Sequence, residues 1–450
     1  MSTTTRTPKK ANPARAAVAA LIGTTLEWYD FTLFTLYSAL IFQQIFFVDS
    51  SPAVATIQSL GIFAAGFLAR PIGALVFGRI GDRLGRKTVL VGTLLVMGIA
   101  TTAIGLLPTH AQIGASAPIL LLVLRLAQGF AAGAEVGTAI TVSAEYARPE
   151  RRGLWAAAPA MGNFAGLILS ALAFRLVVGL PQEDLMTWGW RVPFLAGFVV
   201  VIVGIIVRLG LEETPAFVAK KAAGIVERTT LIQVFRTSWK PMVLLGIVYF
   251  CGNGLSYFFQ ALAASYAAGT LGLAPIDVSN GTLFGAIGGF VTVALYGALS
   301  DRIGRRPVMI AGFVWAVIAA AILFLLVGHG NAIGFLVVMF IALALSNAGV
   351  NAGVNGWGTE IFTTEGRITG MTLSREVAGS LGGGVIPLIG VSLIASAGGA
   401  APYYLLGLAG GLALIGIVVV ALVRETRGRA TDMDHASDSA EDVRQAAPVA

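Results

Sequence analysis

The chain has 450 residues, of which 56 % are hydrophobic and 12 % are charged, and its mean hydropathy is +0.83. Because soluble domains carry about 25 % charged residues, this composition indicates an integral membrane protein. One Cys and three scattered His exclude a disulfide framework and a metal or haem site, and the net charge of +7 lacks the basic stripe typical of nucleic-acid binding. We therefore expect no cofactor, no metal and no nucleic-acid partner.

Apolar segments long enough to cross a bilayer recur along the whole chain. A transmembrane helix needs about 20 predominantly apolar residues. The sequence predicts twelve, at 16–46, 57–78, 88–107, 117–146, 153–178, 191–211, 241–270, 280–299, 307–327, 333–362, 367–397 and 402–423. Several exceed that length, so we expect tilting, kinks or extension beyond the bilayer.

The distribution of basic residues predicts the orientation of these spans. Of the 30 Lys and Arg, 24 lie in the two tails and in the five loops that alternate between them, and the other loops hold none. Since cytoplasmic loops carry the excess of positive charge, both termini are predicted to be cytoplasmic. We expect a multi-pass protein of a bacterial-type inner (plasma) membrane.

Three patterns occur twice, at matching places in the two halves. GRIGDRLGRK at 78–87 returns as GALSDRIGRR at 297–306, offset by 219 positions. The acids and Arg after span four return after span ten, and Glu213-Thr214 returns as Glu425-Thr426. Parallel repeats of this kind occur in secondary transporters.

These repeats predict an all-α integral membrane fold of twelve transmembrane helices in two six-helix parallel repeats. The first half spans 16–211 and the second spans 241–423, and a cytoplasmic linker at 212–240 joins them. A cytoplasmic basic tail occupies 1–15, and a cytoplasmic disordered tail occupies 424–450.

The repeated loop indicates a conformational role in addition to a signal for membrane topology. Its glycines permit a tight turn between two helices, and its Asp can cap a helix N-terminus or pair with Arg. Basic residues that merely hold topology are the alternative, but topology does not require the ordered Gly and Asp twice. We predict a conformational latch formed by Gly78, Asp82, Arg83, Gly85, Arg86, Gly297, Asp301, Arg302, Gly304 and Arg305.

Ionisable residues inside the spans are the candidates for proton coupling, since a charge at the bilayer centre costs at least about 2.5–3.5 kcal/mol. Glu27 and Asp30 lie three residues apart on one helix face, where a carboxylate pair could bind and release a proton. The alternative is an ion pair with Arg70 or Arg125 that holds helices together. Arg125 is a permanent cation whose change of partner would report occupancy. Glu135 is either a second proton carrier or a hydrogen-bonded contact between helices.

A second set of residues is predicted to bind substrate. Arg375 in span eleven is a candidate anion anchor, because a guanidinium matches a carboxylate. Glu376 beside it is equally placed to neutralise it in a wet vestibule. On span seven, polar and aromatic side chains recur every three or four residues, and they either line a cavity or pack between helices. The full set is Arg70, Tyr249, Asn253, Tyr257, Gln260, Arg375 and Glu376.

These motifs also carry a family resemblance. The doubled loop resembles the hallmark loops of the major facilitator superfamily, and RLAQGFAAG at 125–133 resembles its fourth-helix motif, associated with proton coupling. EWYDF at 27–31, ARPIG at 69–73 and WGWRVPF at 188–194 are similar to the metabolite:proton symporter family. That family includes carriers of shikimate, di- and tricarboxylates, and osmoprotectant zwitterions. The resemblance covers nearly the whole chain, but Glu135-Val136 and Arg375-Glu376 depart from it, which concerns the solute rather than the fold.

Together these observations predict a secondary transporter, not an enzyme. It would import a small organic metabolite with protons by alternating access, and the resemblance favours an organic acid such as shikimate or a di- or tricarboxylate. Spans one, two, four and five should face seven, eight, ten and eleven across a midplane site. The expected partners are the solute, protons and the lipid bilayer. We expect the protein to function as a monomer. The alternatives are an uncoupled facilitator, an osmoprotectant symporter of the same fold, a membrane-embedded enzyme and a transporter-like sensor.

Overall fold

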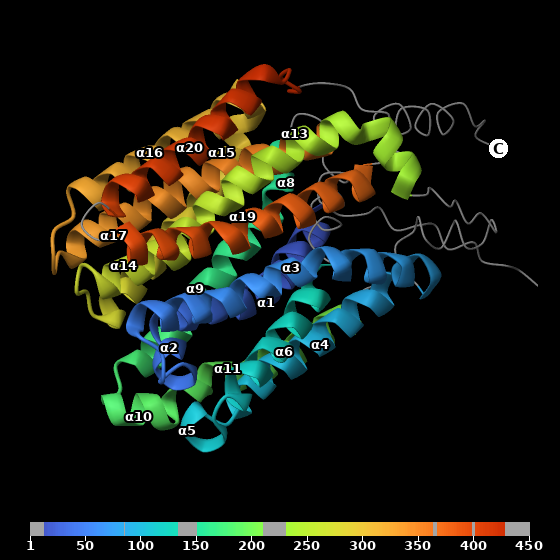
Figure 1. Ribbon diagram of the computed structural model, residues 1–450. Coiled ribbons are helices and arrows are strands. Elements are labelled where there is room, and N and C mark those ends of the chain that lie inside the picture. The colour runs from blue at the N-terminus through green and yellow to red at the C-terminus, as the bar shows by residue number, and fades with distance from the viewer. Residues whose placement is uncertain are drawn as a thin grey trace, which may run out of the picture.

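The computed structural model describes residues 13–84, 86–133, 151–209, 231–362, 367–397 and 401–427, and all regular structure in these ranges is helical. Long helices run side by side as one bundle (Figure 1). The short helices α2 (Phe42–Phe46), α5 (His110–Ile113) and α10 (Gln182–Thr187) gather at one end of it (Figure 1). The predicted all-helical fold is confirmed.

Helices lie at all twelve predicted spans. The first six are α1 (Pro13–Leu40), α3 (Pro52–Leu84), α4 (Arg86–Leu106), α6 (Ser116–Ala132), α8 with α9 (Arg152–Ala156, Ala158–Val178) and α11 (Val192–Leu209). The second six are α13 with the π-helical turn η3 and α14 (Leu231–Tyr257, Phe258–Ala263, Ala264–Gly269), α15 (Pro275–Ile303), α16 (Arg305–Leu325), α17 with the π-helical turn η4 and α18 (Ala332–Phe340, Ile341–Asn347, Ala348–Glu360), α19 (Arg367–Ala397) and α20 (Ala401–Leu422).

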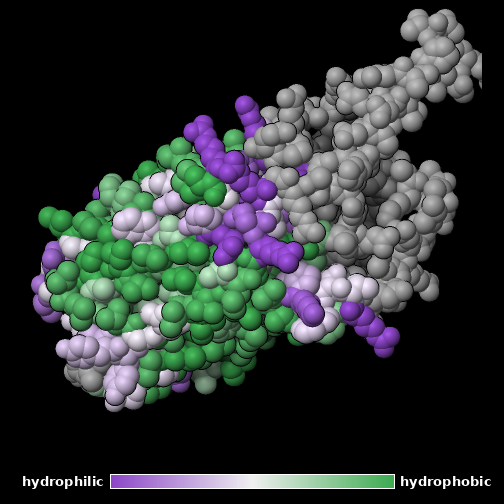
Figure 2. Space-filling model, turned by 90° about the horizontal axis from the view of Figure 1, so that it is seen from above, coloured by the Kyte–Doolittle hydropathy of each residue, from purple (hydrophilic) through white to green (hydrophobic). Residues whose placement is uncertain are grey.

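Length and apolar composition agree with a membrane protein. Among the residues described, eight helices are long and apolar enough to cross a bilayer, and α4 and α6 contribute shorter apolar stretches. Large apolar side chains are exposed on the outer faces, for example Leu295 of α15 at 62 % and Leu414 of α20 at 61 %. Figure 2 shows a broad hydrophobic surface, with hydrophilic side chains gathered on one part of it.

Some boundaries differ from those expected from hydropathy. The first span is interrupted at Ile41, where α1 gives way to α2. The seventh begins at Leu231, inside the segment predicted as linker, and it is kinked at Ser238. Pro241 lies one turn further on, where its ring cannot fit against the carbonyl of residue 237 in a regular helix, and this explains the kink.

Glycines set how closely the helices that carry the site approach. A Cβ on Gly73 of α3 would lie 1.7 Å from the carbonyl oxygen of Phe130 on α6. On α19, a Cβ on Gly382 would lie 2.2 Å from the carbonyl oxygen of Phe250 on α13. Small residues let transmembrane helices touch backbone to backbone in this way, so α6 and α13 hold their side chains against α3 and α19.

Candidate functional site

Helices of the first six and of the second six meet along the bundle. α3 packs against α19, and α9 packs against α15. The Trp28 ring on α1 stacks on the Tyr257 ring at the end of α13, with centroids 6.1 Å apart and an interplanar angle of 14°. Because α18 also packs against α8 and α9, spans one, two and five face seven, eight, ten and eleven, as predicted. The α6 helix of span four packs chiefly on α3 and α4 instead.

Arg70 of α3 is buried between carboxylates from two other helices. Its Nε donates to Glu376 Oε2 on α19 at 2.8 Å, and its Nη2 donates to Glu27 Oε1 on α1 at 3.1 Å. The three side chains are 5 % exposed or less. Because Glu27 belongs to the first six helices and Glu376 to the second six, this ion cluster joins the two groups across their interface.

The structure does not support one of the two roles considered for Glu376. Its carboxylate does not neutralise the adjacent Arg375 in a wet vestibule but is buried against Arg70. Successive residues of an α-helix point in directions about 100° apart, so neighbours in sequence reach different surroundings.

A small, partly open pocket lies beside this cluster. Its lining comes from α1, α3, α13 and α19, and consists of Trp28, Phe67, Arg70, Asn253, Arg375, Glu376, Gly379 and Ser380. The Arg375 guanidinium lies 5.8 Å from the centroid of the Tyr249 ring, and its Nη1 has no hydrogen-bond partner among the described residues. The predicted substrate residues Arg70, Asn253, Arg375 and Glu376 are therefore brought together.

Asp30 has different neighbours from Glu27. Its Oδ2 accepts a hydrogen bond from the Thr101 hydroxyl of α4 at 2.8 Å. The Gln128 amide of α6 donates to that same hydroxyl at 2.7 Å, and Arg125 Nη1 donates to Gln128 Oε1 at 3.2 Å. Asp30 and Arg125 are thus connected through two intermediate side chains, and Glu27 and Asp30 serve two separate networks.

Arg125 is fully buried and forms no ion pair with any described residue. Its guanidinium carbon lies 4.4 Å from the centroid of the Phe31 ring and 4.2 Å from that of Phe34. Aromatic faces attract a desolvated guanidinium by about 2 kcal/mol. A Cβ on Gly66 would lie 2.5 Å from Arg125 Nε, so the glycine makes room for this side chain.

Two other candidates on span seven, Tyr249 and Gln260, form hydrogen bonds within the second six helices. The Tyr249 hydroxyl donates to Asn355 Oδ1 of α18 at 3.1 Å, inside the second six helices. Gln260 Nε2 donates to the Ser256 hydroxyl at 2.7 Å, and Asn347 donates to that hydroxyl at 2.8 Å. Gln260 therefore belongs to a polar cluster at the two π-helical turns, apart from the pocket lining.

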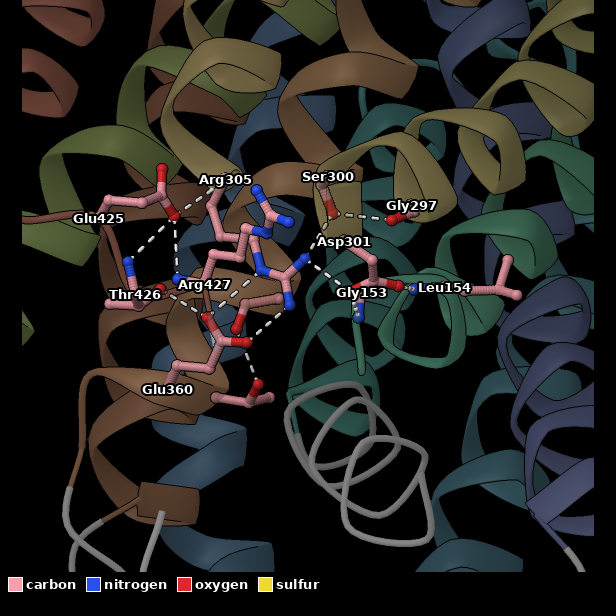
Figure 3. A network of polar contacts seen from close by, with 12 residues as sticks. Gly153, Leu154, Gly297, Ser300, Asp301, Arg305, Glu360, Glu425, Thr426 and Arg427 are labelled. Atoms are coloured by element: carbon pink, nitrogen blue, oxygen red, sulfur yellow. Dashed lines mark hydrogen bonds and ion pairs between the residues drawn. The ribbon is translucent and has the colours of Figure 1, made fainter. Parts of the chain in front are cut away.

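The repeated loop of the second half forms a dense polar network at one end of the bundle (Figure 3). Asp301 accepts hydrogen bonds from the backbone N–H groups of Gly153 and Leu154 at 2.8 and 3.0 Å, which caps α8 of the first six helices. Arg305 pairs with Asp301 and with Glu360 of α18, each at 2.7 Å. Gly304 has φ of +103°, which allows α15 to end and α16 to begin within one residue.

The segment after α20 closes this network. Glu425 accepts hydrogen bonds from the backbone N–H groups of Arg305 and Arg306 at 2.9 and 3.0 Å and so caps α16. The Thr426 hydroxyl donates to Glu360 Oε2 at 2.5 Å (Figure 3). Burial by itself raises the pKa of the Glu425 carboxyl, but its backbone N–H donors outweigh that effect and hold the pKa below its usual range.

Several predicted residues lie outside this description. Gly85 and Glu135 fall outside the described residues, and positions 78, 82, 83 and 86 of the first loop are described in backbone alone. Arg302 is in the last turn of α15 and is not a partner in the described ion pairs of Arg305.

Sequence reasoning missed several polar side chains that the structure brings to these networks. Trp28 and Ser380 line the pocket, and Thr101 and Gln128 connect Asp30 to Arg125. Trp28 and Gln128 lie inside motifs that carry the family resemblance, which was a usable signal. Thr101 and Ser380 carried none, because a single hydroxyl in an apolar helix is ordinary. Within the described ranges no cluster of His, Cys, Asp or Glu could hold a metal ion.

Comparison with known proteins agrees with this architecture. The family model "Sugar (and other) transporter" matches residues 16–241, and "Major Facilitator Superfamily" matches 251–439. The inner membrane metabolite transport protein YhjE of Escherichia coli (strain K12) is 38 % identical over 92 % of this chain and 94 % of its own. The citrate-proton symporter of Klebsiella pneumoniae is 35 % identical over 83 % of each chain. The solved structure of the proton:xylose symporter XylE of E. coli, bound to 6-bromo-6-deoxy-D-glucose, gives a TM-score of 0.72 at 15 % identity, over 94 % of this chain and 98 % of that one.

The structural likeness concerns the fold, and the sequence identities concern the family. Two family models cover the two sets of six helices, and relatives above 30 % identity extend over most of the chain. The protein is a membrane transporter of small metabolites and not an enzyme, and it belongs to the metabolite:proton symporter family of the major facilitator superfamily.

Proposed function

We propose that the protein imports a small organic acid together with protons, by rocking of the halves 16–211 and 241–423 about a central site. Both termini would lie in the cytoplasm of a bacterial-type inner membrane, as the distribution of Lys and Arg favours. The relative named a citrate-proton symporter supports both an organic acid and proton coupling.

The observation that carries this proposal is the position of Arg70 between Glu27 and Glu376. Rocking the halves apart must separate Arg70 from Glu376, and a buried charge that loses its partner costs about 3–5 kcal/mol. A proton on the carboxylate removes part of that cost. A substrate carboxylate at Arg375 adds one negative charge, which the same proton balances. Proton and substrate binding at this cluster would then both favour the change of state.

Asp30 is proposed as a second carboxyl in the proton path. It is 3 % exposed, and its Oδ1 has no hydrogen-bond partner among the described residues. The chain of Thr101, Gln128 and Arg125 would report its protonation to α4 and α6, which pack on α3.

The test is uptake into proteoliposomes with an imposed pH gradient, acidic outside, using radiolabelled shikimate, citrate and glycine betaine. We expect one of the acids to accumulate above its external concentration, and a protonophore to abolish this. Asp30→Asn should remove accumulation while solute exchange across equal pH persists. Glu183→Gln, an exposed carboxyl of α10, is the matched control and should accumulate like the parent.

The alternatives predict other results in the same assay. An uncoupled facilitator would equilibrate the solute whatever the gradient, and an osmoprotectant symporter would accumulate glycine betaine but neither acid. Parental accumulation by Asp30→Asn would remove Asp30 from the proton path.

A further inference from the structure

Three buried hydrogen-bond donors at the pocket have no partner among the described residues: Trp28 Nε1, Ser380 Oγ and Arg375 Nη1. Trp28 is 5 % exposed and Ser380 is 3 % exposed, so water does not satisfy them from bulk. A buried donor without a partner costs about 1–3 kcal/mol, and native proteins rarely leave several together. Their convergence on one cavity indicates a ligand that supplies hydrogen-bond acceptors.

The charges around the pocket select how many carboxylates that ligand carries. Arg70 already pairs with Glu27 and Glu376, so it offers no open charge. Arg375 forms no ion pair with any residue in the described ranges. One cation is therefore open to a ligand. A second carboxylate on the ligand would have to sit near the two glutamates without a cation of its own.

The walls of the pocket combine aromatic rings with a close approach between two helices. The rings of Trp28 and Phe67 provide apolar faces, and Tyr257 contacts both rings from the second six helices. A Cβ on Gly379 would lie 2.4 Å from Asn253 Nδ2, so glycine brings this amide close to α19.

We propose that Trp28, Arg375 and Ser380 form a donor-rich subsite for a small organic anion with a single carboxylate and further acceptors such as hydroxyl groups. Arg375 binds the carboxylate, and Trp28 Nε1 and the Ser380 hydroxyl bind the other oxygens. The subsite selects against di- and tricarboxylates because it contains one open cation. This inference rests on the proposed function, since it names the class of acid that the carrier moves.

The test is the melting temperature of the purified carrier with a panel of probes, because a ligand that binds the folded state stabilises it. The panel is shikimate, quinate and lactate as monocarboxylates, succinate, citrate, and glycine betaine. We expect a hydroxylated monocarboxylate to raise the melting temperature most, and citrate to leave it unchanged.

Substitutions then assign the donors, using the monocarboxylate that binds best. Trp28→Phe keeps the stacked ring but removes the N–H, and Ser380→Ala removes the hydroxyl; each should weaken binding about 10-fold. Arg375→Gln should weaken it about 100-fold, and Arg375→Lys should restore part of the loss. The matched controls are Trp357→Phe and Ser374→Ala, which alter a buried indole and a buried hydroxyl outside the pocket and should bind like the parent.

Failure of this inference differs from failure of the proposed function. If succinate, citrate or glycine betaine binds best, or none of the probes binds, the single-carboxylate subsite is wrong. Unchanged affinity in Trp28→Phe and Ser380→Ala also overturns it. If a monocarboxylate binds as expected but the pH gradient does not drive its uptake, the subsite stands and proton coupling falls.

Discussion

Two buried arginines, Arg70 in the middle of the bundle and Arg305 at its end, each lie between two carboxylates. The partners of Arg70 come from different halves, Glu27 from α1 and Glu376 from α19. Those of Arg305, Asp301 and Glu360, both come from the second six helices. The same chemistry therefore connects the halves at one place and stiffens one half at the other.

The difference indicates which interactions would break in the proposed rocking of the halves. Separating the halves around the pocket breaks a buried ion pair. Separating them at the end of the bundle breaks the hydrogen bonds that the backbone N–H groups of Gly153 and Leu154 donate to Asp301. Each of these two charge-assisted hydrogen bonds contributes about 1.5–3 kcal/mol, so together they are comparable to the 3–5 kcal/mol of a broken buried ion pair. The ion pair differs because its separation leaves charges in the interior that a proton or a substrate must balance. The central cluster is thus expected to control whether the carrier moves, and the terminal network to bias which state it occupies.

The largest effect is expected from Arg70→Met, which leaves Glu27 and Glu376 buried without their shared cation. We expect uptake at background and a loss of about 3–5 kcal/mol of stability. The triple variant Arg70→Met, Glu27→Gln, Glu376→Gln removes all three charges. It should recover most of the melting temperature but none of the proton-driven uptake. Normal transport by the triple variant would show that the cluster is structural only.

A smaller effect is expected in the network around Arg305. Asp301→Ala removes the cap of α8 and one partner of Arg305, so the equilibrium between states should shift about 5–150-fold without loss of transport. Distances between spin labels on α8 and α15, measured by double electron–electron resonance, report this shift. Cys251 is replaced beforehand so that only the introduced cysteines carry labels. Asp277→Ala, at the opposite end of α15, is the control. An unchanged distance distribution would mean that Asp301 is no latch.

The smallest effect concerns Glu425 and pH. Its pKa is held below the usual range in the folded state, so its contribution to stability is present above pH about 4.3 and is lost as pH falls through the folded value. Glu425→Gln should therefore melt below the parent at pH 7, and the two melting temperatures should converge in acid. A constant difference at every pH would show that the backbone bonds to the carboxylate do not contribute.

Much of the architecture was available from the amino-acid sequence. Hydropathy placed all twelve spans, and the doubled GxxxDRxGR loop indicated two related sets of six, because span length and turn residues are local properties. The boundaries at Ile41 and Leu231 were not predicted, since a break inside an apolar segment and a helix extending from the membrane leave hydropathy almost unchanged.

The candidate site was predicted in its members but not in its connections. The sequence offered Arg70 or Arg125 as partner for the carboxylates of α1, and the structure pairs Glu27 with Arg70 and directs Asp30 to Thr101. It also turns Glu376 away from Arg375. Hydropathy could show that charges lie within the spans, because the place of a residue in an apolar segment depends only on its neighbours in sequence. Which charges meet depends on close approaches at Gly66, Gly73 and Gly382, and these arise only when helices distant in the chain pack together.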